Sequence, residues 1–152
     1  MKYYILMIFT CFIASFVKAD IELVSQLDFG TIAILDNSQV ETYRLYDDGR
    51  VRTTDNILIV KAGSPAVIRV FDLAPNTPIV VTNLITDNTF RSGEPGTNTL
   101  ELTELSSSIL LNTDEAGEVI FSLGGTLVTN GNSTLQYGNS FLLARFNVTI
   151  DY

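Results

Sequence analysis

The amino-acid sequence predicts an all-β fold, an immunoglobulin-like antiparallel β-sandwich of roughly seven to nine strands. Three observations predict it. Short apolar and β-branched stretches recur between clusters of Gly, Asn, Asp and Pro, and several of them alternate apolar and polar residues with the period of a strand. No segment after residue 19 has a clear helical period. The chain has one Cys and no Trp, which excludes an antibody-type core but not the sandwich itself.

The first 19 residues have the features of a secretory signal peptide. Lys2 gives a positive start, the apolar run 3–17 follows, and the small residue Ala19 marks the expected cleavage site. A retained membrane anchor is the alternative, although the run is shorter than the ~20 residues that a spanning helix needs. We therefore expect a signal peptide over residues 1–19, a single β-sandwich domain over residues 20–152, and no retained transmembrane segment.

The first expected strand runs from Asp20 to Phe29. Its apolar residues alternate with polar ones, which predicts a half-buried strand. Gly30 is expected to kink the chain after it. The residues that share the apolar face are Ile21, Leu23, Leu27 and Phe29.

The next segment predicts a hairpin followed by a central strand. Val40 to Tyr46 alternates, Asp47-Asp48-Gly49 has the residues of a tight turn, and Val51 to Thr54 leaves that turn. Ile57 to Val60 is continuously apolar, which predicts a central strand covered on both faces.

The remaining expected strands are separated by turns and loops rich in Gly, Pro and Asn. Asp87 to Asn98 contains Gly and Pro and is expected to form a surface loop. Gly124-Gly125 inside a strand predicts a bulge or a close backbone approach. These strands are Ala66 to Leu73, Ile79 to Thr86, Leu100 to Leu105, Ile109 to Leu111, Glu118 to Val128 and Phe141 to Tyr152.

The composition excludes several functional classes. The chain has no His and one Cys, so it cannot form a Ser–His–Asp or Cys–His catalytic centre, an imidazole metal site or a thiolate zinc site. A formal net charge of −8 argues against binding nucleic acid, which needs clustered Lys and Arg. Paired carboxylates remain compatible with catalysis, but the acidic residues lie mostly in expected turns or on polar strand faces. We expect no enzymatic activity and no cofactor.

Two acidic turns are candidate Ca²⁺ sites. Asp47-Asp48 with Asp55 forms one, and Asp114-Glu115 with Glu118 forms the other. Neither has the alternating ligands of a Ca²⁺-binding loop, so turn chemistry and solvated charge are the favoured explanation.

Both terminal strands are candidates for strand exchange between proteins. In the last strand, Phe146, Val148, Ile150 and Tyr152 share one face, and such a strand can pair with a chaperone by β-augmentation. In the first, Ile21, Leu23, Leu27 and Phe29 have the pattern of a donor strand that fills a groove in a neighbouring subunit. The alternative for each is that it is an ordinary strand of the domain's own core.

Four sequence segments, in order along the chain, resemble a known family. They are Leu27 to Ile32, Gly63 to Val70, Leu123 to Leu127 and Phe146 to Tyr152. The family comprises small exported bacterial β-proteins catalogued as a domain of unknown function and described as pilin- or fimbrillin-like. The sequence departs from it at Ala144, where a Gly is expected.

The resemblance implies a β-sandwich subunit exported by a Gram-negative-type bacterium to the periplasm, the outer surface or an extracellular fimbria. Its implied partners are other copies of itself or other fimbrial subunits, a periplasmic chaperone and an outer-membrane usher, and the family carries no catalytic motif. The leading expectation is therefore a structural subunit assembled by strand complementation. The alternative is a self-sufficient periplasmic or surface module that recognises a glycan or protein through loops Asp87 to Asn98 and Thr129 to Ser140.

Overall fold

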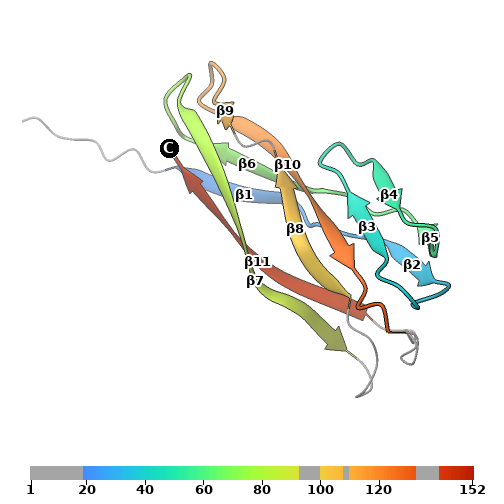
Figure 1. Ribbon diagram of the computed structural model, residues 1–152. Coiled ribbons are helices and arrows are strands. Elements are labelled where there is room, and N and C mark those ends of the chain that lie inside the picture. The colour runs from blue at the N-terminus through green and yellow to red at the C-terminus, as the bar shows by residue number, and fades with distance from the viewer. Residues whose placement is uncertain (1–18, 93–99, 108–109, 133–140) are drawn as a thin grey trace, which may run out of the picture.

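The computed structural model describes residues 19–92, 100–107, 110–132 and 141–152 (Figure 1). These residues form antiparallel strands and no helix, which confirms the predicted all-β sandwich class. The described part of the chain has eleven strands, more than the seven to nine expected; β2, beyond the kink at Gly30, pairs with β5 separately from β1. The strands are β1 (Asp20–Ser25), β2 (Thr31–Ile34), β3 (Thr42–Leu45), β4 (Val51–Thr53), β5 (Ile57–Lys61), β6 (Ala66–Phe71), β7 (Pro78–Ser92), β8 (Glu101–Ser107), β9 (Leu110–Asn112), β10 (Val119–Val128) and β11 (Phe141–Asp151).

The largest sheet is built around β10. Its strand order is β1-β6-β10-β3-β4, and β8 also pairs with β10. The first half of β10 pairs with β6, while its second half pairs with β3 and β8. A second sheet has the order β11-β7-β9, and β2 and β5 form a two-stranded ribbon (Figure 1). The long strand β10 therefore connects the two ends of the molecule.

Two hydrophobic clusters form the core, one toward each end of β10. The β6–β7 cluster lies between the β6 region of the large sheet and the β11-β7-β9 sheet, and the β3–β8 cluster is covered by the β2–β5 ribbon. β10 contributes Phe121 to the first and Leu127 to the second. The buried residues of the β6–β7 cluster are Ile68, Val70, Leu73, Ile79, Val81 and Phe121; those of the β3–β8 cluster are Tyr43, Leu45, Ile57, Leu100, Leu102 and Leu127.

Two glycines allow the segment that follows β1 to cross close over the segment between β5 and β6. We call this close approach, at residues 28–30 and 61–64, the crossing. Asp28 and Ser64 exchange backbone hydrogen bonds of 2.9 and 2.7 Å. A Cβ at Gly30 would lie 2.1 Å from the Lys61 carbonyl oxygen, and one at Gly63 would lie 2.2 Å from the Asp28 carbonyl oxygen. Gly30 also has a φ of +76°. Side chains at these positions would clash with backbone, so only glycine permits this crossing.

The expected kink at Gly30 and the close approach at Gly124 are both confirmed. A Cβ at Gly124 would lie 2.2 Å from the Leu45 carbonyl oxygen. The pairing of β10 with β8 also shifts register between Thr126 and Leu127. The glycine pair therefore lets β3 pass close to β10 at the point where β10 changes partners.

The expected hairpin at Asp47-Asp48-Gly49 is confirmed. The Gly49 amide donates to the Tyr46 carbonyl at 3.0 Å, the Tyr46 amide donates to the Arg50 carbonyl at 2.8 Å, and Gly49 has a φ of +83°. In β3, Tyr43 and Leu45 are buried, whereas Thr42 and Arg44 lie on the opposite, outer face. The alternation of this segment therefore predicted its two faces correctly.

The prediction of a central strand at Ile57 to Val60 was wrong. These residues belong to β5, which among the described strands pairs only with β2. Ile57 is buried in the β3–β8 cluster, but Leu58 and Val60 are 53% and 64% exposed on the outer face of the ribbon. A continuous apolar run indicates burial on both faces only when a second layer covers the strand, and no described element does so here.

The expected loop Asp87 to Asn98 is also only partly a loop. β7 continues to Ser92 and pairs with β11 over this stretch, with Phe141 opposite Ser92. Polar residues in this segment suggested a loop, but pairing with the long strand β11 supplies the backbone hydrogen bonds that extend β7. Residues 93–99 lie outside the described part of the chain.

Candidate functional site

The last predicted strand, β11, is built into the second sheet. It pairs antiparallel with β7 along its length, with Phe146 opposite Ile85 and Ile150 opposite Val81. Val148 and Ile150 are half-buried and pack against the β6–β7 cluster. Tyr152 follows the strand and is exposed, while the side chain of Phe146 lies outside the described part of the structure. The apolar face of β11 therefore belongs to the domain's own core at Val148 and Ile150.

The first predicted strand is divided between two environments. Ile21 and Leu23 in β1 lie opposite Val70 and Ile68 of β6, and directly opposed residues share a face of the sheet. Both β1 side chains thus face the core side, yet they are 58% and 56% exposed. The other two predicted residues, Leu27 and Phe29, follow β1 and pack against the β3–β8 cluster instead.

The two terminal strands meet at one open side of the sandwich. β1 is the outermost strand of the large sheet, and β11 is the outermost strand of the second sheet. The chain just before β1 lies near the end of β11, since the Ala19 amide donates a hydrogen bond of 3.3 Å to the Tyr152 hydroxyl oxygen, a contact that the expected cleavage after Ala19 would remove. In Figure 1 the start of β1 and the end of β11 lie together near the C-terminus. We call this region, formed by β1 and β11 with Ile21 and Leu23 uncovered, the terminal edge.

On its outer face, β1 is tied to the sheet by charge. Arg69 of β6 contacts both oxygens of the Glu118 carboxylate, at 2.7 and 2.6 Å, and also reaches Glu22 of β1 at 3.5 Å. The hydrogen bonds from Arg69 hold the pKa of Glu118 below its usual value. The bidentate pair with Glu118 is the stronger of the two contacts, so the link to β1 through Glu22 is weak.

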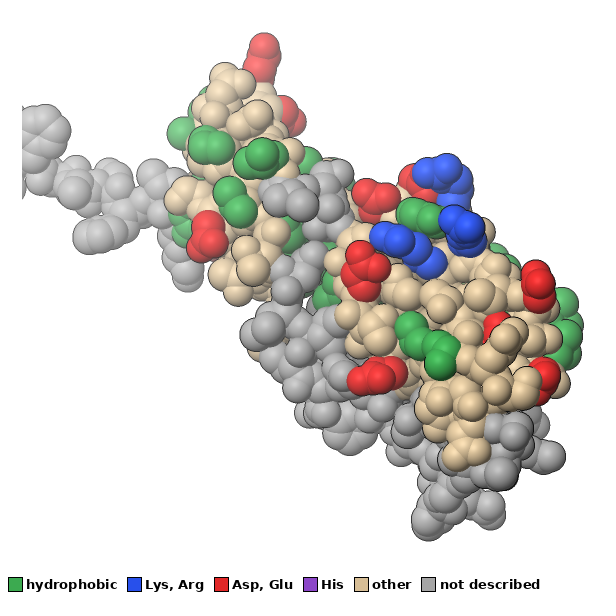
Figure 2. Space-filling view, viewed as in Figure 1, with side chains coloured by type: hydrophobic (Ala, Val, Ile, Leu, Met, Phe, Trp, Pro, Cys, Tyr) green, Lys and Arg blue, Asp and Glu red, His purple; other side chains and the backbone are tan. Residues whose placement is uncertain are grey.

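A second surface feature, which sequence reasoning missed, lies on the outer face of β3 and β4. Arg44 and Arg52 are directly opposite each other in the hairpin. The guanidinium carbons of Arg44 and Arg50 lie 5.0 and 5.4 Å from the centre of the Tyr46 ring. Figure 2 shows that the cationic side chains on that face of the molecule gather in one place.

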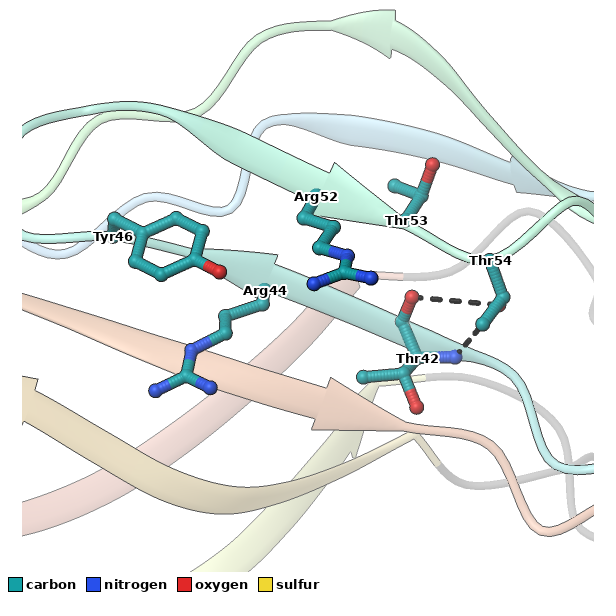
Figure 3. A pocket seen from close by; sticks show the side chains of 6 residues that line it. All are labelled: Thr42, Arg44, Tyr46, Arg52, Thr53 and Thr54. Atoms are coloured by element: carbon teal, nitrogen blue, oxygen red, sulfur yellow. Dashed lines mark hydrogen bonds between the residues drawn. The ribbon is translucent and has the colours of Figure 1, made fainter.

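These side chains border a shallow pocket of about 290 Å³. In Figure 3 the Tyr46 ring and the guanidinium groups of Arg44 and Arg52 lie over the two strands of the hairpin. The lining residues are Thr42, Arg44, Tyr46, Arg52, Thr53 and Thr54. The turn at Asp47-Asp48-Gly49 was a usable signal, because counting outward from it places Arg44 opposite Arg52.

The acidic turns serve local structure. The Asp114 carboxylate accepts backbone hydrogen bonds from Ala116 at 2.9 Å and Glu118 at 3.0 Å, and Asp48 accepts one from Arg50 at 3.0 Å. In the described part of the chain no group of three or more acidic, His or Cys side chains could hold a metal ion. Of the two loops considered as binding surfaces, residues 93–99 and 133–140 lie outside the described structure.

Comparison with known proteins identifies the family of the chain. Among the described residues, no helix is long and apolar enough to cross a membrane. No curated protein and no solved structure matches the chain. One family model does match, over residues 20–152, and it covers all four segments singled out in the sequence. The chain therefore belongs to the family described as Domain of unknown function (DUF4402).

Proposed function

We propose that this protein is a non-enzymatic exported subunit of a fimbria- or pilin-like surface structure, assembled by strand complementation at the terminal edge. One observation carries the proposal: Ile21 and Leu23 face the core side of the sandwich but remain more than half exposed. In the second sheet, β11 is the outermost described strand. A strand added beside β11 would lie over β1 and cover both side chains.

The energetics require a strand and not merely an apolar contact. Covering the exposed halves of two aliphatic side chains contributes roughly 1 kcal/mol each. Association alone costs about 4 kcal/mol or more, so these two contacts are insufficient. Backbone hydrogen bonds contribute about 0.5–1.5 kcal/mol each, and β11 pairs with no described strand on its other edge. A complementing strand gains both terms together, which is the physical basis of β-augmentation.

The partner in this proposal is a strand from another subunit, or from a periplasmic chaperone before assembly. Export is supported by the signal-like segment 1–19, after which the family match begins at Asp20. An isolated domain with an uncovered apolar strand and an open sheet edge is prone to unwanted association. A chaperone that occupies the terminal edge until assembly would prevent this, and an usher would then exchange it for the next subunit.

The test uses the protein as the cell processes it, purified without denaturation. We expect assemblies that survive mild detergent and separate into monomers only on unfolding. Leu23→Asp should release folded monomers, because it places a charge under the incoming strand. Ile120→Asp is the matched control, since Ile120 is also exposed but lies opposite Arg69, on the outer face of the same sheet.

The proposal fails if the native protein is a monodisperse folded monomer that never takes up a peptide spanning Asp20 to Phe29. It also fails if Leu23→Asp and Ile120→Asp disrupt assembly equally, because the terminal edge would then have no special part in it. Hydrogen exchange adds a direct readout: the β11 backbone amides that point away from β7 should be protected in assemblies and exchange freely in Leu23→Asp monomers, while those paired with β7 stay protected in both.

A further inference from the structure

We propose that the outer face of the β3–β4 hairpin is a binding site for a carboxylate-bearing polysaccharide, recognised by Arg44, Arg52 and Tyr46. The site is separate from the terminal edge, because β1 and β4 lie at opposite ends of the strand order of the large sheet. It therefore does not depend on how the subunit assembles.

The first argument is the placement of charge. The whole chain has 9 Lys and Arg against 17 Asp and Glu, yet three arginines lie within or beside one short hairpin. Arg44 and Arg52 are directly opposed across the strands, an arrangement that is normally destabilising because like charges repel. An anion bound between them would relieve that repulsion.

The second argument is that both guanidinium groups have donors to spare. Arg44 reaches Glu104 through one nitrogen at 3.4 Å, and that pair is about half exposed. The Arg52 side chain forms no ion pair with any described residue. A guanidinium presents a planar fork of donors that matches the two oxygens of a carboxylate. The hairpin therefore offers one whole fork at Arg52. Arg44 adds a second guanidinium on the same face, of which Nη2 contacts Glu104 and Nε is buried.

The third argument concerns the class of ligand. Around the guanidinium groups the lining consists of Tyr46, Thr42, Thr53 and Thr54. Thr42 shares the outer face of β3 with Arg44, whereas Thr53 lies opposite the buried Tyr43 and Thr54 Oγ1 accepts a hydrogen bond of 2.9 Å from the Thr42 amide. A nucleic acid would need many cations for its phosphates, which the acidic chain does not offer. The Thr42 hydroxyl, the Tyr46 ring and the guanidinium donors of Arg52 and Arg44 on a shallow, open surface fit an acidic sugar polymer.

The test is binding of the protein, as the cell processes it, to immobilised polygalacturonate. Dextran is the neutral probe, dextran sulfate the sulfated probe and poly-glutamate the peptide probe. We expect binding to polygalacturonate, none to dextran, and weaker binding to poly-glutamate. Arg52→Gln should weaken binding at least tenfold. Lys61→Gln, which removes one positive charge from β5 outside the lining residues, should leave binding nearly unchanged.

Two further measurements distinguish specific recognition of a carboxylate from nonspecific attraction between opposite charges. Arg52→Lys keeps the charge but loses the planar fork, so it should also weaken polygalacturonate binding at least several-fold. Arg52→Gln should leave the melting temperature unchanged or higher, because it removes a like-charge pair. The proposal is overturned if Arg52→Gln binds as the native protein does, if Arg52→Lys restores full binding, if polygalacturonate does not bind, or if poly-glutamate or dextran sulfate binds more tightly than it does.

Discussion

The two terminal strands have nearly the same sequence pattern and opposite roles in the fold. β11 pairs with β7 along its length and places Val148 and Ile150 against the β6–β7 cluster. β1 pairs with β6 just as regularly at first, but its core-facing Ile21 and Leu23 remain more than half exposed. The alternation of apolar and polar residues therefore predicts which side chains share a face of a strand. It does not predict their burial, which depends on whether a second layer of the fold covers that face.

The largest expected effect comes from breaking the crossing that anchors β1. Gly63→Ala would place a Cβ 2.2 Å from the Asp28 carbonyl oxygen, so the backbone must move. We expect a loss on the order of 3 kcal/mol in the free energy of unfolding, measured by denaturant titration. Gly49→Ala is the control, because Gly49 has a φ of +83° but no atom closer than 3.9 Å, and it should cost only about 1 kcal/mol. Equal costs would mean that the crossing does not hold β1.

Truncating one apolar side chain in each terminal strand should have an intermediate effect on the free energy of unfolding, and the loss should differ between the two strands. Ile150→Ala removes atoms packed against the β6–β7 cluster and should cost roughly 2 kcal/mol of unfolding free energy. Leu23→Ala removes a side chain that is 56% exposed, and in the monomer it should cost less than about 1 kcal/mol. Thermal and chemical melts of the monomer measure both. A larger loss for Leu23→Ala would show that β1 is already covered.

The smallest expected effect is on the melting temperature, when the Glu118 carboxylate on the outer face beside β1 loses its charge. The pKa of Glu118 is lowered in the folded protein by hydrogen bonds from Arg69. Its contribution to stability is therefore present above the unfolded pKa of about 4.3 and is lost as the pH falls through the lower folded value. Glu118→Gln should lower the melting temperature slightly at about pH 7 and not at about pH 2. Glu115→Gln, on the adjoining turn, is the charge-matched control; an identical pH profile for both variants would contradict the assignment.

Local features of the fold were predictable because local chemistry determines them. The turn at Gly49, the kink at Gly30 and the alternation of β3 each follow from residues a few positions apart. The environment of β5 was not predictable in this way, because the same apolar run suits a central strand or the exposed ribbon that it forms. Deciding between them requires knowing which distant strands lie over it.

The candidate sites were likewise predictable only where residues close together in the sequence determine them. Both terminal strands were found from their alternation, but their meeting at one edge depends on the sheet order, which joins segments from opposite ends of the chain. The net charge of the whole chain, −8, does not reveal the arginines of the hairpin. They form a local cluster of positive charge only when the two strands are paired. The register of a hairpin was the information that would have revealed them.

The glycine crossing also sets a length scale for any exchange in which β1 itself leaves the sheet. With Asp28 held to Ser64 by two backbone hydrogen bonds, only the chain before that point is free to move. From the start of β1 at Asp20 to Leu27, this chain spans at most about 28 Å when fully extended. If the proposed assembly used β1 as its donor strand, the accepting subunit would have to lie within that reach, and the crossing would limit the spacing of successive subunits.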